Sequence, residues 1–252
     1  MNRHALFILL LLLLTACNRD DKNDSDNDNA SVDTAALIEA AAQKIDDASA
    51  FQLELVVNGA PVFLDGAAID LDVPVTFQRA EGVFVAPDSL GGEVTILLED
   101  DVTAEVKLIA IGEDQYLQHP LITFNQWEAI TFSPNFNPAT LVEGDESIPA
   151  ALRTMSAVEY VGVEDIDGIN MHHIRGEVEV SRVSAVTVGL IGTTEGVVKG
   201  DIYIRERDGL LERMILEEPI NPEIDPDQPS IWTIGLYDYN GDYTVTRPDI
   251  QE

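Results

Sequence analysis

Apolar and polar residues alternate along much of the chain after residue 50. In residues 51–58 the apolar side chains occupy every second position, which predicts a strand with one buried face. Runs of the same kind predict further strands over residues 73–79, 82–86, 94–99, 104–112, 115–117, 158–164, 169–180, 201–205, 211–217, 231–239 and 243–246. Breakers such as Gly91-Gly92 and Asn240-Gly241 predict turns between them. This close spacing indicates an antiparallel meander rather than β-α-β units.

Helical patterns are few. Asp33 is placed to cap a helix that runs to Asp47, because the apolar residues there recur at helical spacing. Two short helices are expected from Asn137-Pro138 and from Ser147 onward, each with a proline near its start. Residues 184–192 could form a strand or a short helix, and the four prolines of residues 219–229 indicate a loop.

These elements predict an α+β domain: a large curled antiparallel sheet, or half-open barrel, with a few helices covering its concave apolar face. The covered face could be a filled core or could enclose room for an apolar ligand. The periodicity of the strands leaves both alternatives open.

The first seventeen residues have the layout of a secretory signal. Arg3 precedes the unbroken apolar run of residues 5–14, which is too short to span a bilayer. The ending Leu14-Thr15-Ala16-Cys17 is similar to a bacterial lipobox, whose cysteine receives a diacylglycerol. We therefore expect a signal peptide over 1–16, lipid attachment at Cys17, an acidic flexible tether over 17–32 and one domain over 33–252. An ordinary signal or anchor with an incidental cysteine is the alternative.

The net charge and the single cysteine indicate which partners are not expected and how the domain is stabilised. The chain has 14 Lys and Arg against 46 Asp and Glu, and removal of residues 1–16 leaves a net charge of −33. Such a surface is repelled by phosphates, so nucleic acid is not an expected partner. With its one cysteine acylated the domain has no disulfide, and it must be stabilised by burial of its core.

No chemistry for catalysis or metal binding is predicted. Asp24, Asp26 and Asp28 alternate as in a calcium loop, but Asn29 stands where glycine is needed. The chain has no Gly-x-Ser-x-Gly elbow and no P-loop. His172 and His173 would point to opposite faces of a strand, so they cannot share a metal ion. We expect no enzyme, no cofactor and no metal, and a hydrogen-bonded structural role for His173.

Short segments in a fixed order carry a resemblance to a known family. They are Ala80 to Asp88, Tyr116-Leu117, Trp127, Phe136-Asn137-Pro138 with Leu141, Asp167-Gly168 with His173 and Gly176, Ile202-Tyr203-Ile204, and Asp208-Gly209-Leu210 with Glu212-Arg213. Over residues 33 to 247 their order resembles the LppX/LprA/LprF/LprG lipoprotein family, with the acidic tether and the 219–229 loop as departures.

The resemblance implies a half-open barrel similar to the LolA/LolB carriers, with an apolar cavity for the acyl chains of lipids or glycolipids. It implies transport of such lipids across the envelope. From the signal and the lipobox we expect an exported protein that is anchored to the outer face of the cell membrane, on its periplasmic or extracellular side. The partner that would deliver or take the lipid is not specified. The alternative is a non-enzymatic surface interaction or signalling lipoprotein with a filled core.

Alternate strand positions supply the candidate lining of such a cavity. The expected lipid-binding residues are Phe51, Leu53, Leu55, Val57, Val75, Phe77, Val94, Ile96, Leu98, Val106, Leu108, Ile174, Val178 and Ile204. Each could equally be an ordinary core residue.

Overall fold

The computed structural model describes residues 32–64, 75–98, 102–120, 123–134, 136–183, 185–191 and 196–250. The expected signal peptide, Cys17, residues 17–31 of the tether and the aspartates of the rejected calcium loop lie outside these residues. So do the first two residues of the strand expected over 73–79 and the last residue of the one expected over 94–99.

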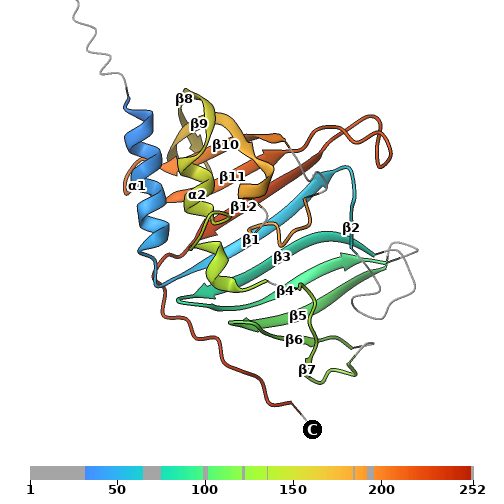
Figure 1. The fold of residues 1–252 in the computed structure, drawn as a ribbon. Helices are drawn as coiled ribbons and strands as arrows, with labels where there is room; N and C mark the ends of the chain where they lie inside the picture. Colours follow the sequence, from blue (N-terminus) through green and yellow to red (C-terminus); the bar gives the residue numbers. More distant parts are fainter. Residues whose placement is uncertain are drawn as a thin grey trace, which may run out of the picture. The chain divides into compact units, whose positions relative to one another are not determined.

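The unit formed by Val32–Glu252 is built on one antiparallel sheet (Figure 1). Its strands are β1 Ala50–Gly59, β2 Val62–Leu64, β3 Val75–Val85, β4 Ser89–Leu97, β5 Thr103–Ile111, β6 Asp114–Gln118, β7 Glu128–Ala129, β8 Ser156–Ile166, β9 Ile169–Glu179, β10 Val197–Arg205, β11 Leu211–Glu217 and β12 Ser230–Tyr237. The described residues also form two α-helices, α1 Thr34–Asp46 and α2 Ile148–Arg153, and the 3-10 turns η3 Pro138–Leu141, before α2, and η4 Val180–Arg182, after β9. The expected antiparallel sheet with few helices is confirmed.

The strand order is β7-β6-β5-β4-β3-β1-β12-β11-β10-β9-β8, with β2 beside β3. Strand β1 is the seam, because it pairs with β3 on one side and with β12 on the other. It joins a first meander, β3 to β7, to a second one, β8 to β12. Strands β7 and β8 form the two edges of this order, so the sheet is not closed. It is not strongly curled either. The expected half-open barrel is therefore wrong in this respect, and the sheet is open.

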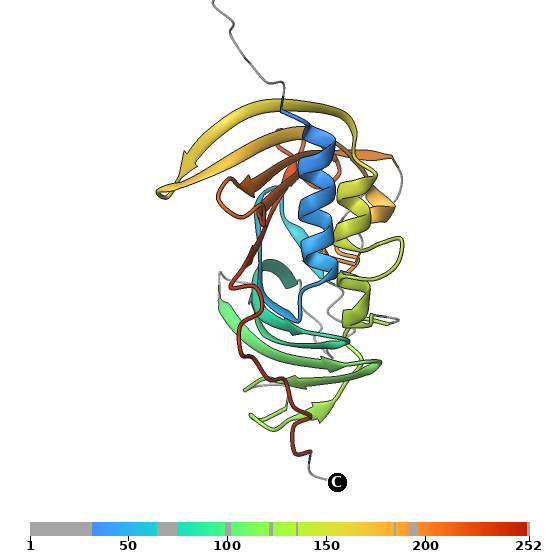
Figure 2. The same ribbon diagram turned by 90° about the vertical axis from the view of Figure 1, so that its left-hand side faces the viewer.

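The helices begin where the sequence predicts. Asp33 caps α1 by accepting a hydrogen bond from the backbone N–H of Ala36, and Ser147 caps α2 through the N–H of Ala150. The buried residues of α1 are Ile38, Ala41, Ala42 and Ile45. The two alanines let α1 approach its neighbours closely, and α1 and α2 lie side by side on one face of the sheet (Figure 2).

The turn predicted at Gly91-Gly92 is wrong. Gly91 and Gly92 lie inside β4, where Gly92 pairs with Gly82 of β3, and the turn before them is at residues 86–88. Strand β3 runs without a break over Val75–Val85, where the sequence predicts two separate strands over 73–79 and 82–86. Glycines in these paired positions reflect close approach of two backbones rather than a bend, which local sequence does not distinguish.

The last predicted hairpin does not form. The described residues contain no strand over 243–246, because β12 is already flanked by β1 and β11 and offers no free edge. The C-terminal segment instead runs over the face of the sheet that is turned away from the helices. There Gln52 of β1 donates to the hydroxyl of Tyr243 over 2.8 Å, and Arg247 pairs with Asp114. Residues 185–191, which the sequence left undecided, form turns after η4.

A charged cluster ties α1 to the turn between β10 and β11. Lys44 of α1 donates to the backbone carbonyl of Asp208, and the guanidinium of Arg205 lies 3.0 Å from the Asp208 carboxylate and 3.4 Å from that of Glu212. The Glu212 side chain is 16% exposed, and burial raises its pKa above the ordinary value of 4.5.

Replacement of Glu212 by Gln tests this cluster. The folded chain holds the Glu212 proton more tightly than the unfolded chain, so the related stability is present below pH 4.5 and is lost as pH rises through the folded pKa. We expect the wild type to lose stability relative to Glu212→Gln as pH rises above 4.5. Urea denaturation of both proteins over a pH series measures the difference, and a difference independent of pH would contradict the assignment.

Candidate functional site

The first meander encloses an apolar cavity of about 420 Å³ that is partly open to solvent. Its floor is the face of β1 and β3 to β6 that is turned toward the helices. Its roof comes from residues 132–141 and 186–190, which lie outside the strands. The volume falls within the range of about 300–1,000 Å³ that is usual for sites of small ligands.

Pairing registers place the floor residues in rows across the sheet. One row reads Leu53, Gly82, Gly92, Leu108 and Leu117 from β1 to β6, and all five line the cavity. The two glycines leave the backbone bare between leucines, so they form the deepest part of the floor.

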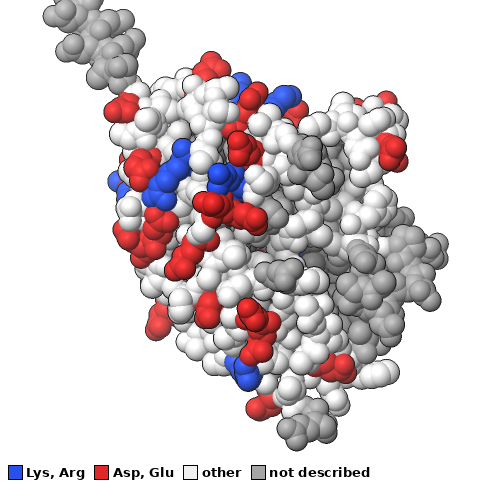
Figure 3. Space-filling view, viewed as in Figure 1, with Lys and Arg blue, Asp and Glu red and all other residues white. Residues whose placement is uncertain are grey.

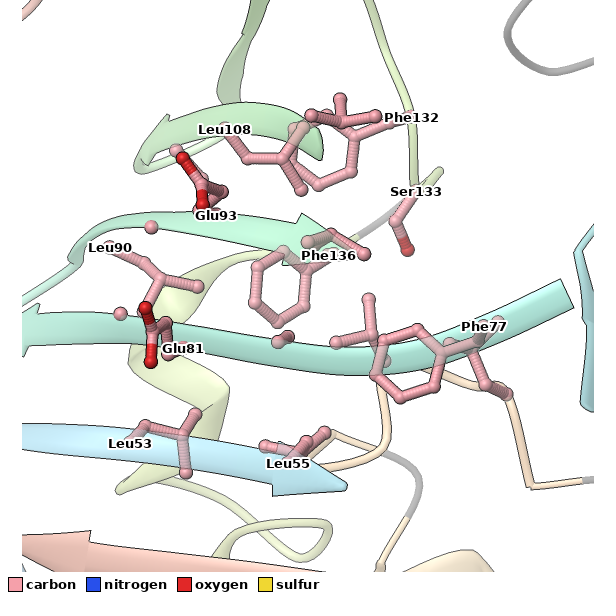
Figure 4. Close-up of a pocket in the computed structure, with 18 of the residues that line it drawn as sticks. Leu53, Leu55, Phe77, Glu81, Leu90, Glu93, Leu108, Phe132, Ser133 and Phe136 are labelled. Carbon is pink, nitrogen blue, oxygen red and sulfur yellow. The ribbon is translucent and has the colours of Figure 1, made fainter. Parts of the chain in front are cut away.

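Aromatic residues close the cavity from above. Figure 4 shows Phe136 lying over β3 and β4, with Phe132 next to Leu108 and with Phe77 toward the other end of the cavity. Phe136 immediately precedes Asn137, which caps η3, and Leu141 at the end of η3 also lines the cavity. The start of this short 3-10 turn therefore sets the position of the roof.

The roof also contains an unusual backbone conformation. Val188 lines the cavity and has a φ of 53°, a region that a β-branched residue rarely adopts. Gly189 follows with a φ of 72°. Such strained conformations cluster at ligand-binding segments, where the surrounding structure maintains them.

The polar groups of the cavity are few. Ser133 is a polar residue of the roof. Glu81 and Glu93 also border the cavity, but they are in register with Lys107 on the opposite face of the sheet, where the carboxylate of Glu81 pairs with Arg79 at 2.7 Å. The described residues hold no group of His, Cys, Asp and Glu arranged for a metal ion. The cavity is suited to hydrocarbon rather than to a polar ligand.

Seven of the fourteen expected lining residues lie on the cavity wall: Leu53, Leu55, Phe77, Val94, Ile96, Val106 and Leu108. The structure places the others in packed regions. Phe51, Ile174, Val178 and Ile204 are fully buried in the main core, Val57 packs against it, and Val75 and Leu98 belong to a second cluster beside the cavity. That lipid contacts any of them stays a prediction.

Sequence reasoning missed the roof and the small residues of the floor. The missed lining residues are Leu64, Ala80, Glu81, Gly82, Leu90, Gly92, Glu93, Ala110, Leu117, Phe132, Ser133, Pro134, Phe136, Leu141, Val186, Val188 and Leu190. Phe136 and Leu141 are among the residues that carry the family resemblance, which is the signal that could have identified the roof.

His119, His172 and His173, the histidines among the described residues, lie outside this cavity. His173 of β9 is buried with one ring nitrogen 2.6 Å from the Glu164 carboxylate and the other 2.6 Å from that of Asp201. His172 contacts the hydroxyl of Tyr160 at 3.0 Å. Burial lowers the pKa of His119, which lies in the loop after β6. The two carboxylates hold the His173 ring between three neighbouring strands.

The model of the LppX_LprAFG lipoprotein family matches residues 33–245. The chain belongs to the LppX_LprAFG lipoprotein family. Among the described residues of this family member, no helix is both long and apolar enough to cross a bilayer. A comparison with curated proteins finds no match.

Two solved structures from the family have a similar fold. LprF from Mycobacterium bovis matches with a TM-score of 0.63 and 10% identity over 85% of this chain and 96% of its own. LppX from Mycobacterium tuberculosis matches with a TM-score of 0.53 and 16% identity over 84% of this chain and 98% of its own. At these identities the likeness is one of fold.

Adjacent glycines of β4 test the geometry of the cavity floor. A methyl group at Gly92 would lie 2.5 Å from the carbonyl oxygen of Glu81, whereas one at Gly91, on the opposite face, would meet the side chain of Val245 at 3.3 Å. We expect Gly92→Ala to lower the free energy of unfolding by about 1–3 kcal/mol, because a backbone has to move. Gly91→Ala, the matched control, should lower the free energy of unfolding by less, because the side chain of Val245 in the C-terminal segment can shift. Chemical denaturation measures both, and equal losses would contradict this geometry.

Proposed function

We propose that this lipoprotein binds the acyl chains of a lipid or glycolipid in the cavity of its first meander and carries them across the cell envelope. The observation that carries the proposal is the apolar cavity of about 420 Å³ in a member of this lipoprotein family. A core filled throughout the sheet would instead favour the alternative, a surface interaction or signalling lipoprotein, whereas the β1–β6 half of this sheet encloses a cavity.

The chemistry of the lining supports hydrocarbon as the ligand. Burial of apolar surface contributes about 25 cal/mol per Å², or about 0.8 kcal/mol per methylene, so about ten buried methylenes contribute about 8 kcal/mol. This gain needs no hydrogen-bond donors, which agrees with the scarcity of polar groups in the cavity. The same scarcity supports a carrier rather than an enzyme.

The surface supports anchoring through a covalent lipid rather than through charge. Acidic side chains are spread over the face that Figure 3 shows, with a few lysines and arginines among them. Cations of the described residues pair with acids, as Lys199 does with Glu217 at 2.6 Å and Arg79 with Glu54 at 2.6 Å. An anionic membrane would repel such a surface, so the diacylglycerol expected on Cys17 would hold the protein at the outer face of the cell membrane.

Replacement of Cys17 by Ala tests the anchor. We expect the variant to appear in the soluble fraction, since the sequence has no other cysteine that could take a diacylglycerol. Fractionation of cells that express either form, with mass spectrometry of the N-terminus, measures the change. A Cys17→Ala protein that remained in the membrane fraction would contradict lipid anchoring at this residue.

Filling the cavity tests the ligand site. Leu108 of β5 lines the cavity, whereas its neighbour Lys107 is exposed on the opposite face. We expect Leu108→Trp to reduce lipid that co-purifies with the protein by about tenfold or more, because the indole occupies space that about two methylenes or more would fill. Lys107→Trp, the matched control, should retain it.

Gentle purification followed by lipid extraction and mass spectrometry measures the bound lipid. Thermal melting shows whether both variants are folded. Wild-type protein that is repeatedly free of lipid and takes up no hydrophobic dye would contradict the carrier function.

A further inference from the structure

We infer that the cavity accommodates one long acyl chain, so that the preferred ligand buries a single chain and leaves any second chain outside. This inference rests on the proposed function and concerns the class of lipid. It follows from the volume of the cavity, from the packing that bounds it and from the shape of its floor.

The volume fits one chain. A cavity of 150 Å³ in another protein accepts benzene, which suggests about 25 Å³ for each carbon atom. At this scale the cavity of about 420 Å³ holds about 17 carbons. A chain of palmitoyl or stearoyl length would therefore fill it.

The cavity cannot extend into the second half of the sheet, because that half is packed. Phe77, on the cavity wall, stacks on Trp232 of β12 with ring centroids 5.7 Å apart. The indole N–H of Trp232 donates to the carboxylate of Glu218 over 2.7 Å, and Trp232 is fully buried. Leu141 and Val186, which also line the cavity, belong to the same core cluster as Phe77 and Trp232 and are each 1% exposed. Together these side chains separate the hollow half from the filled half.

The floor has one trough. Ala80 and Gly82 on β3 lie directly opposite Val94 and Gly92 on β4, so three of these four positions at the cavity floor carry a methyl group or no side chain. Leu53 and Leu108 stand on the two flanks, and Phe136 lies above (Figure 4). A trough between two leucines and under one phenyl ring accepts a chain lengthwise and leaves no parallel place for another.

Lysophosphatidylcholines of increasing chain length provide the test, because their zwitterionic head group stays constant. Displacement of a fluorescent fatty acid from the full domain, at concentrations below micelle formation, measures each affinity. We expect binding to tighten about fourfold for each added methylene until the chain reaches about 16–18 carbons, and then to level off. Dipalmitoyl phosphatidylcholine should bind within about fourfold of its one-chain counterpart, which is the change that one further buried methylene would cause.

Two variants make the length limit specific to this cavity. Phe136→Ala removes a six-carbon ring from the roof and should move the limit to longer chains by about six carbons. Leu108→Trp should move it to shorter chains, and Lys107→Trp should leave it unchanged. Thermal melting confirms that each variant is folded, and if Phe136→Ala does not fold, the Leu108→Trp and Lys107→Trp pair still decides the result.

The outcomes separate this inference from the proposed function. A two-chain lipid that binds more than about a hundredfold tighter than its one-chain counterpart, in competition with the fluorescent fatty acid, would overturn the single-chain limit while leaving the carrier function in place. Absence of binding for every chain length in the wild type would overturn the carrier function itself.

Discussion

The packing of α1 and α2 against the β9–β12 half of the sheet decides where this domain is solid and where it is hollow. Ile38, Ala41, Ala42 and Ile45 of α1 belong to one core cluster with residues of β9 to β12, and Lys44 anchors the same helix to the β10–β11 turn. The helices are too few to cover the β1–β6 half as well. That half receives irregular segments instead of helices, and irregular segments leave room between themselves and the sheet.

Strand β1 connects the hollow half and the filled half of the sheet. Because it pairs with β3 and with β12, the hollow meander and the filled meander share one continuous hydrogen-bonded sheet. Phe51 of β1 stacks on Phe84 of β3 at 4.9 Å and lies 5.9 Å from Tyr239, so aromatic packing reinforces the seam. The packed core of the filled half can therefore stabilise the hollow half, which has less buried core of its own. This matters because the chain, with one cysteine, has no internal disulfide to stabilise it.

The sequence predicts the floor of the site better than its roof, for a physical reason. Alternation at Leu53, Val94 or Leu108 identifies the face of a strand that is turned from water, and this holds whether the face is covered by a helix or by a cavity. Ile174 and Val178 have the same alternation yet lie in the packed half. What covers a strand depends on segments distant in the chain, and no local period records it.

The wrong predictions at Gly91-Gly92 and at residues 243–246 also arise because strand pairing depends on segments distant in the chain. Gly91-Gly92 has the composition of a turn, but its pairing with β3 and β5 makes it part of a strand. Residues 243–246 have the composition of a strand, but both neighbours of β12 are already in place. Phe136 could be noticed from its place in the family pattern, although nothing in its immediate neighbourhood indicates that it stands over a cavity.

The course of the C-terminal segment has a practical consequence for work on this protein. Val245 faces Gly91 on the side of β4 that is turned away from the cavity, and the guanidinium of Arg247 lies 5.7 Å from the ring centroid of Tyr116 on the same side. A fusion partner or surface linker attached after this segment would leave from the back of the half that holds the cavity. Immobilisation through such a linker would therefore present the cavity side to solution.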